Sequence, residues 1–128
     1  MMTWQVEVSA EFEAWWSGLT ESERESVDAH VRLLETLGPA LGRPQADTIK
    51  GSRHPNLKEL RVQHRGRPMR ILFAFDPRRV AILLLGGDKT GDKRWYARMV
   101  PHAEAIFDAH LVSLAEPKQG QSAPKRRR

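Results

Sequence analysis

Residues 57–76 read LKELRVQHRGRPMRILFAFD, and this stretch decides the fold. Two runs of alternating apolar side chains flank Arg65-Gly66, a dipeptide suited to a tight two-residue turn. Such a turn makes the numbers of paired residues sum to 131 and sets apolar side chains opposite one another on one face. The expected apolar pairs are Val62 with Met69 and Leu60 with Ile71. The stretch therefore predicts a β-hairpin with one buried face.

The opposite face of this hairpin has an unusual pair. The same register places Arg61 directly across from Arg70. Like charges facing each other destabilise a sheet unless an anion lies between them. We therefore expect these two arginines to hold an anion.

Further strands extend the hairpin into a sheet. Residues 80–85 (VAILLL) are apolar on both sides, which is typical of a central strand covered on both faces. Residues 4–8 alternate apolar and polar side chains, as a half-buried strand does. With residues 57–64 and 68–76 they predict a small, mostly antiparallel sheet of about four strands.

Two helices are expected between the first strand and this hairpin. Ser9 is a suitable N-cap for a short helix that ends near Leu19. Thr20 and Glu23 have the spacing of a capping box for a second helix, which Gly38-Pro39 ends. The tryptophans of the first helix fall at helical spacing, so we assign them to the core rather than to a ligand. The sequence thus predicts an N-terminal helical hairpin.

The remainder of the chain is assigned in the same way. Residues 92–114 repeat apolar side chains at intervals of three and four and predict a C-terminal helix, with Pro101 in its first turn. Residues 38–56 contain three prolines and predict a loop. Residues 116–128 have no apolar anchor and predict a disordered basic tail. We therefore expect one α+β domain over residues 1–115.

Composition limits where the protein works. A chain of 128 residues without cysteine must be stabilised by packing, which suits a reducing compartment. The N-terminus lacks the basic start and apolar run of a signal peptide, and no apolar stretch is long enough to span a bilayer. We expect a cytoplasmic protein without a membrane partner.

Charge is divided unevenly along the chain. Residues 1–37 hold eight acidic and two basic residues, whereas residues 43–98 hold five acidic and fourteen basic residues, a net charge of +9. A basic half of this kind is typical of a surface that binds phosphate, although it is also compatible with a merely solvated face. Nucleic acid is therefore the expected ligand.

The loop after the apolar strand carries no nucleotide or metal motif. Gly86 and Gly91 match the glycines of a P-loop, but Asp92 stands where that motif requires lysine. Asp88 and Asp92 are each followed by a lysine, and no histidine or cysteine lies at ligand spacing. We expect neither a metal nor any other cofactor.

RNA can be cut without a metal when its own 2′-hydroxyl attacks the adjacent phosphate. This reaction needs a base, an acid and cations around the phosphate. Taken singly, each basic residue is more commonly a solvated charge, and Tyr96 could be a half-buried helix residue, so their convergence is the prediction. The candidate catalytic residues are Arg61, Arg70, Lys89, Lys93, Tyr96, Lys58 and His54, and the candidate RNA-binding residues are Lys50, Arg53, Arg65, Arg67, Arg94 and Arg98.

The ordered pieces LKELR (57–61), MRILFAFD (69–76) and LLGGDKTGDK (84–93), followed by Trp95-Tyr96 and Pro101, resemble a known toxin family. The chain is similar to the HigB-like, phage Gp49-related branch of the RelE/ParE superfamily over roughly residues 4–114. This resemblance implies a compact sheet with two N-terminal helices and one C-terminal helix. It also implies metal-independent cleavage of mRNA on the ribosome, and silencing by a cognate HigA-like helix-turn-helix antitoxin.

The resemblance also suggests roles for individual residues. Arg61 and Arg70 correspond to the strand arginines that grip the scissile phosphate, and Lys89, Lys93 and Tyr96 to the basic and aromatic set after the last strand. The chain lacks the lysine-lysine pair found there in many relatives. The expected base is Lys58 or His54, and the expected acid is Tyr96 or Lys93. The alternative function is that of a ParE-like gyrase-binding toxin or a catalytically idle nucleic-acid-binding module.

Overall fold

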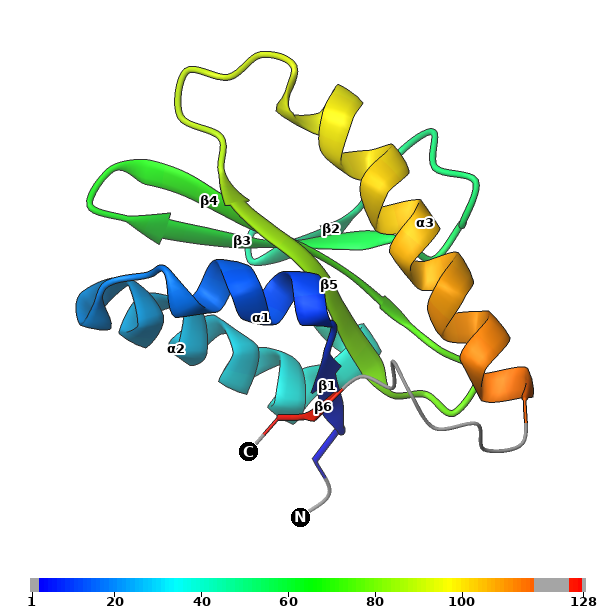
Figure 1. Cartoon of the computed structure of the whole chain (residues 1–128). Coiled ribbons are helices and arrows are strands. Elements are labelled where there is room, and N and C mark those ends of the chain that lie inside the picture. Colours follow the sequence, from blue (N-terminus) through cyan, green and yellow to red (C-terminus); the bar gives the residue numbers. More distant parts are fainter. Residues whose placement is uncertain (1–2, 117–124, 128) are drawn as a thin grey trace.

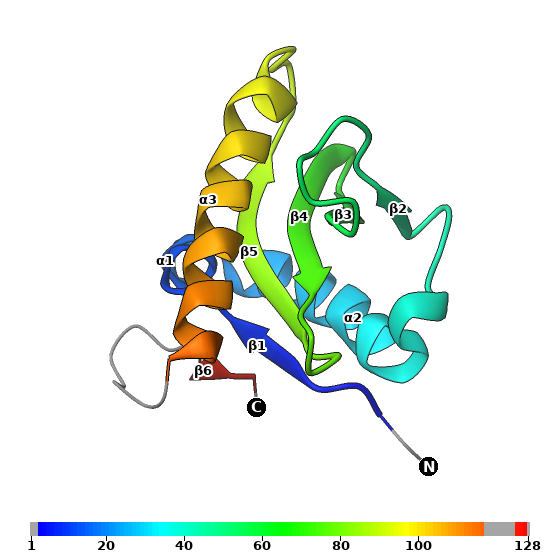
Figure 2. The ribbon, with the colours of Figure 1, turned by 90° about the vertical axis from the view of Figure 1, so that its right-hand side faces the viewer.

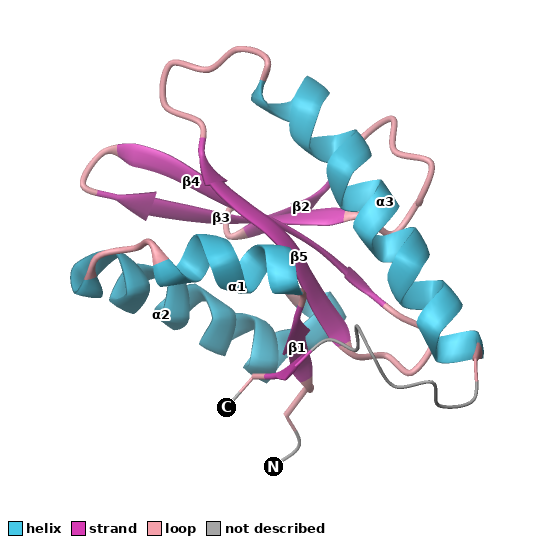
Figure 3. Cartoon of the chain, in the orientation of Figure 1, coloured by secondary structure: helices cyan, strands magenta, loops and turns pink. Residues whose placement is uncertain are grey.

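The computed structural model describes residues 3–116 and 125–127 and shows an α+β domain (Figures 1 and 3). A six-stranded sheet has the order β2-β3-β4-β5-β1-β6. The strands are β1 (Val6–Val8), β2 (Ala46–Thr48), β3 (Lys58–His64), β4 (Arg67–Phe75), β5 (Ala81–Asp88) and β6 (Lys125–Arg126). The helices are α1 (Ala10–Ser17), α2 (Glu21–Leu37) and α3 (Trp95–Ala115), and a short 3-10 turn covers Gly38–Ala40. The predicted fold class is confirmed.

The β3–β4 hairpin has the predicted register. Arg61 pairs with Arg70, and Leu60 pairs with Ile71. Arg65 and Gly66 have positive φ angles of 52° and 79°, as the two central residues of a type I′ turn require. The position of this turn therefore fixes which side chains of the hairpin face each other.

Two apolar cores lie on the two faces of the sheet. One lies between the sheet and the α1–α2 pair and includes Leu60 and Ile71, while the other lies under α3 and includes Leu72 and Ile82. Helix α3 belongs to one core and the α1–α2 pair to the other, and Figure 2 shows α3 and α2 on different sides of β4 and β5. Because β4 and β5 contribute to both cores, the central strands are covered on both faces, as the sequence predicts for residues 80–85.

The predicted helix caps are present. The Ser9 hydroxyl accepts a hydrogen bond from the Phe12 amide at 2.9 Å. Thr20 and Glu23 form the complete capping box, with Thr20 N donating to Glu23 Oε1 at 2.8 Å. These contacts satisfy backbone donors at the starts of α1 and α2.

Strand β5 is longer than predicted and continues through Gly86 and Gly87. A Cβ atom on Gly86 would lie 2.2 Å from Cε3 of Trp15, and one on Gly87 would lie 2.7 Å from Nε1 of Trp95. The two glycines therefore let one indole pack directly against each face of the strand. Sequence periodicity cannot reveal such a strand end, because glycine has no side chain to show which way it faces.

Three further differences concern element boundaries and pairing. Residues 46–48, predicted as loop, form the edge strand β2 and pair with β3. Strand β1 runs parallel to β5, with Val6 beside Ala81, so the mostly antiparallel sheet contains one parallel pair. Helix α3 starts at Trp95, which places Pro101 in its second turn rather than its first.

Most of the predicted disordered tail lies outside the described residues. Where the structure does describe it, Lys125–Arg126 form strand β6, antiparallel to β1. Arg127 then contacts Asp28 and Glu35 of α2. Acidic residues of α2 therefore neutralise a cation that the sequence assigns to a free tail. No helix within residues 3–116 and 125–127 is both long and apolar enough to cross a membrane.

Candidate functional site

The facing arginines lie on the α3 side of the sheet, and the anion between them comes from the protein itself. The Glu59 carboxylate accepts a hydrogen bond from Arg61 Nε at 3.1 Å and lies 3.6 Å from Arg70 Nε. Glu59 points to this side because it is two residues from Arg61 on β3. Its side chain is almost fully buried. One carboxylate therefore offsets the repulsion between two guanidinium groups.

Tyr96, in the first turn of α3, completes this group. Its hydroxyl donates a hydrogen bond of 2.6 Å to Glu59 Oε1. Burial, followed by the hydrogen bond to the Glu59 carboxylate, raises the pKa of Tyr96 above its ordinary value. The Lys89 ammonium lies 5.8 Å from the centre of the Tyr96 ring. The structure thus brings together Glu59, Arg61, Arg70 and Tyr96, and we call these four residues the Glu59 cluster. Lys89 lies beside the cluster.

Arg70 is the least satisfied member of the Glu59 cluster. Its Nη1 donates to the Met69 carbonyl at 3.0 Å. Its Nε is buried and has no hydrogen-bond partner among the described residues, since the Glu59 oxygen at 3.6 Å is too distant. An unsatisfied buried donor is costly, and an incoming oxyanion would satisfy it.

An open cavity of about 590 Å³ adjoins the Glu59 cluster. Its polar side includes Asp47, whose carboxylate contacts Arg43 at 3.0 Å and Arg61 at 3.3 Å. The hydrogen bond from the Thr48 amide, together with Arg43, lowers the pKa of Asp47. The lining residues are Arg43, Asp47, Thr48, Ile49, Lys50, Glu59, Arg61, Tyr96, Ala97, Val100 and Pro101. The cavity therefore joins the sheet edge at β2 to the first turns of α3.

The structure does not bring the two expected bases to the Glu59 cluster. Lys58 pairs with Phe73, whose side chain belongs to the core under α1 and α2, so Lys58 lies on the other face of β3 from Arg61. His54 contacts Asp108 of α3 at 2.7 Å and packs edge-on against the Phe107 ring. His54 therefore fastens the loop before β3 to α3.

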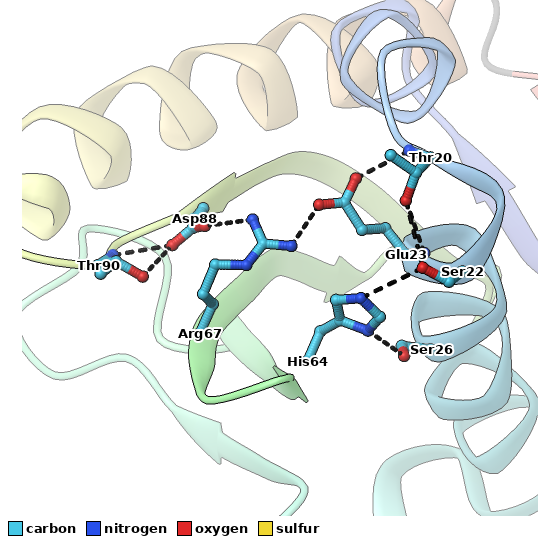
Figure 4. A network of polar contacts seen from close by, with 8 residues as sticks. All are labelled: Thr20, Ser22, Glu23, Ser26, His64, Arg67, Asp88 and Thr90. Carbon is cyan, nitrogen blue, oxygen red and sulfur yellow. Dashed lines mark hydrogen bonds and ion pairs between the residues drawn. The ribbon is translucent and has the colours of Figure 1, made fainter.

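Three of the expected RNA-binding arginines have carboxylate partners within the protein. Arg53 contacts Asp108 at 2.8 Å, and Arg98 contacts Asp92 at 2.6 Å. Arg67 lies between Glu23 of α2 and Asp88 at the end of β5 (Figure 4). The three arginines therefore connect different segments of the protein to one another, in addition to any contact with RNA.

The hydrogen bonds around Arg67 hold the loop that carries Lys89. Asp88 also accepts from the amide and hydroxyl of Thr90, and the Lys89 amide donates to the Pro68 carbonyl at 3.0 Å. His64, the last residue of β3, contacts Ser26 of α2 at 2.7 Å (Figure 4). The turn end of the β3–β4 hairpin is thereby tied both to α2 and to the loop after β5.

The remaining predicted cations are open to solvent. Lys50 is exposed and lines the cavity. Lys93 and Arg94 are exposed just before α3, and Arg65 is exposed in the β3–β4 turn. They are therefore free to contact a large partner beyond the Glu59 cluster.

Sequence reasoning missed Glu59, Asp47 and Arg43. Glu59 stands inside the LKELR segment, and its two-residue separation from Arg61 signals that both side chains share a face. Asp47 and Arg43 carry no such signal, because their place depends on the short strand β2. Within the described ranges, no three histidine, aspartate or glutamate residues are grouped so that they could hold a metal ion.

The protein is thus an α+β domain with a helical hairpin on one face of its sheet and a cluster of arginine, tyrosine and carboxylate side chains on the other. The model of the phage-derived Gp49-like proteins (DUF891) matches residues 14–108, and the chain belongs to that family, in its HigB-like branch.

Two relatives come from Mycobacterium tuberculosis strain H37Rv. The chain is 46% identical to "Putative toxin HigB2" over 117 residues, which are 90% of this chain and 56% of that protein. It is 50% identical to "Putative toxin HigB3" over 102 residues, which are 79% of this chain and 88% of that protein. The chain thus spans little more than half the length of HigB2 but most of HigB3.

Proposed function

We propose that this protein is the toxin of a toxin–antitoxin system and cleaves mRNA on the ribosome without a metal ion. The names of the two HigB relatives support the toxin assignment. The observation that carries the endonuclease assignment is the Glu59 cluster, in which Arg61 and Arg70 share one carboxylate and the buried Arg70 Nε lacks a hydrogen-bond partner among the described residues. A phosphate oxygen would supply the missing acceptor.

The chemistry follows from the groups that this cluster brings together. The 2′-oxygen of RNA attacks the adjacent phosphorus, and the bond from phosphorus to the 5′-oxygen breaks. Glu59 accepts the proton of the 2′-hydroxyl, and Tyr96 donates its proton to the departing 5′-oxygen. Arg61 and Arg70 stabilise the additional negative charge on the phosphate. The products are a 2′,3′-cyclic phosphate and a free 5′-hydroxyl.

These roles replace the two bases expected from the sequence. Glu59 is the carboxylate in contact with Tyr96 and both arginines, whereas Lys58 and His54 lie elsewhere. The phenol of Tyr96 is protonated at neutral pH even with an ordinary pKa, and its raised pKa keeps the proton in place until the leaving oxygen takes it. Lys89, beside the Tyr96 ring, adds positive charge near the leaving oxygen.

The exposed cations suggest which partners the protein binds. Lys93, Arg94 and Arg65 extend the positive surface beyond the cluster and would contact ribosomal RNA, whose phosphates attract such residues. A HigA-like helix-turn-helix antitoxin would silence the toxin by covering the same surface. We therefore propose that the protein acts in the cytoplasm, where both proposed partners are found.

Primer-extension mapping of mRNA after induction tests this function. The wild-type protein should yield new 5′ ends, and Arg70→Ala should abolish them because the phosphate loses its buried donor. Arg32→Ala is the matched control: Arg32 lies on α2 with a 75% exposed side chain and should leave cleavage unchanged. Toxicity with intact mRNA would overturn the endonuclease assignment in favour of a gyrase-binding or catalytically idle protein.

A further inference from the structure

We propose that the 590 Å³ cavity beside the Glu59 cluster binds the nucleobase next to the scissile phosphate. The inference rests on the proposed endonuclease function and adds a substrate subsite to it. Pockets that hold small organic ligands have volumes of about 300–1,000 Å³, so the cavity is large enough for a nucleoside. Its walls differ in a way that matches the faces and the edges of a base.

One wall of the cavity is apolar. Val100 and Pro101 come from α3, and Ile49 comes from the segment after β2. A nucleobase is flat and presents two large faces of low polarity, which suit such a wall. Tyr96 belongs both to the cavity lining and to the Glu59 cluster, so an aromatic ring of the kind that bases stack on lies where the two meet. A base that turns out of the RNA strand would therefore exchange water for apolar contact.

The cavity also has a polar residue that the protein does not use. Lys50 lines the cavity, and its side chain forms no hydrogen bond or ion pair with the described residues. Asp47, by contrast, is already bound by Arg43 and Arg61. The free ammonium group is a donor, and an acceptor atom on the edge of a base would satisfy it.

Pro101 adds one acceptor to the apolar wall. In a regular helix the amide of residue 101 would donate to the Ala97 carbonyl, but proline has no N–H. Ala97 and Pro101 both line the cavity. The Ala97 carbonyl therefore lacks its usual helix partner and can accept a hydrogen bond from an amino or imino group of the base.

The position of the cavity decides which base it would bind. Glu59, Arg61 and Tyr96 belong both to the cavity lining and to the cluster proposed to hold the phosphate. A nucleotide is short enough that a phosphate on Arg61 leaves its own base beside that residue. The subsite therefore belongs to a nucleotide bonded to the scissile phosphate, and not to a distant part of the transcript.

Direct titration of the purified full-length protein tests this subsite. The probes are the four nucleoside 3′-monophosphates and, as the base-free comparison, ribose 5-phosphate, with binding followed by calorimetry or by NMR shifts. At least one nucleotide should bind about tenfold more tightly than ribose 5-phosphate. Equal affinity of all five probes would overturn the proposal.

Two variants test whether the cavity is responsible for the tighter binding of the nucleotides. Val100→Trp fills the cavity and should remove the advantage of the nucleotide while keeping the affinity for ribose 5-phosphate. Val112→Trp is the matched control, because Val112 is exposed on α3 and lies outside the cavity lining. If Val100→Trp does not fold, Ala97→Leu on the same wall replaces it. Retention of the full nucleotide advantage in the cavity variant would contradict the proposal.

The failure of this subsite differs from the failure of the proposed function. Arg70→Ala should weaken the nucleotides and ribose 5-phosphate alike, since both depend on the phosphate contact. An absence of mRNA cleavage in cells, together with base-dependent binding in vitro, would refute the endonuclease and leave the subsite standing. Cleavage by a protein without base-dependent binding would refute the subsite alone.

Discussion

Two of the buried carboxylates among the described residues, Asp76 after β4 and Glu59 in β3, have different surroundings. Asp76 accepts hydrogen bonds from the amides of Arg78 and Val80, at 2.8 and 3.2 Å, and from the side chains of Arg78 and His110. Within the described part of the chain, the polar partners of Glu59 are side chains alone, those of Tyr96, Arg61 and Arg70.

The difference teaches how a structural carboxylate is distinguished from a functional one. Backbone amides are fixed by the fold, so Asp76 locks the turn between β4 and β5 together with α3. Side-chain donors can rotate toward a new acceptor, so the partners of Glu59 can exchange it for a phosphate. Burial alone would classify the two residues together, whereas the nature of the donors separates them.

Glu59→Gln should have the largest effect, which is on the rate of mRNA cleavage. A small effect would remove the distinction drawn between Glu59 and Asp76. Glutamine keeps the size of the side chain and an oxygen for Tyr96, but it cannot act as a base at neutral pH. The cleavage rate on ribosome-bound mRNA should fall about 100- to 10,000-fold, the usual contribution of a general base. Single-turnover kinetics measure this rate.

A substrate analogue separates loss of chemistry from loss of binding. An RNA with one 2′-deoxy sugar at the scissile position cannot be cleaved by this route, and it should bind Glu59→Gln at least as tightly as it binds the wild type. Weaker binding by the variant would show that Glu59 positions the RNA instead of accepting a proton.

Asp76→Ala should act on stability. The substitution removes the only carboxylate partner that the described residues give the buried His110, whereas Arg78 keeps its contact with Glu7 at 2.8 Å, and breaking a buried ionic contact costs about 3–5 kcal/mol. Urea denaturation should show a loss of about this size. Cleavage per folded molecule should stay at the wild-type level.

Asp108→Ala provides the matched control on α3. Its carboxylate is 45% exposed and contacts Arg53 and His54 at the surface, so its removal should cost clearly less than the removal of Asp76. Equal losses would mean that the backbone hydrogen bonds of Asp76 add nothing.

The smallest expected effect concerns Glu23 on α2, whose carboxylate is 14% exposed and also has an arginine partner. The hydrogen bond from Arg67, followed by that from the Thr20 amide, lowers the pKa of Glu23 from 4.5 to about 2. A lowered folded-state pKa contributes stability that is complete above about pH 4.5 and is lost as the pH falls toward 2. The stability difference between wild type and Glu23→Gln should therefore shrink across this range in acid denaturation curves. A difference that stays constant down to pH 2 would contradict the assignment.

The contribution of Asp76 to stability should depend on pH in the same direction. Burial acts to raise its pKa, but the hydrogen bonds from His110 and Arg78 outweigh burial and lower it. Its contribution to stability is likewise lost on acidification, below its ordinary value of 3.8.

The sequence predicted the parts of the fold that depend on neighbours along the chain. The register of Arg61 and Arg70 followed from one turn, and the start of α2 followed from Thr20 and Glu23. Strand β2 was not predicted because its three residues are too few to show an alternation of apolar and polar side chains. Its formation depends on pairing with β3. The parallel contact of β1 with β5 escaped because it joins residues more than seventy positions apart.

The candidate site divides in the same way. The sequence placed Arg61 and Arg70 together and required an anion between them, but it could not show that Glu59 supplies it. Strand periodicity alone separates Lys58 from Arg61, since three residues along a strand lead to opposite faces. The attachment of His54 to Asp108 depends on how α3 crosses the sheet, which no local pattern encodes.

The parallel pairing of β1 with β5 has a consequence for synthesis of the protein. Val6 leaves the ribosome early but cannot find its partner until Ala81 has been made, and Tyr96 follows later still. Since domains fold as their segments emerge, the β1–β5 pair cannot form before Ala81 has emerged, and the Glu59 cluster cannot assemble before Tyr96 has emerged. The β1–β5 pair can therefore form before the Glu59 cluster is complete.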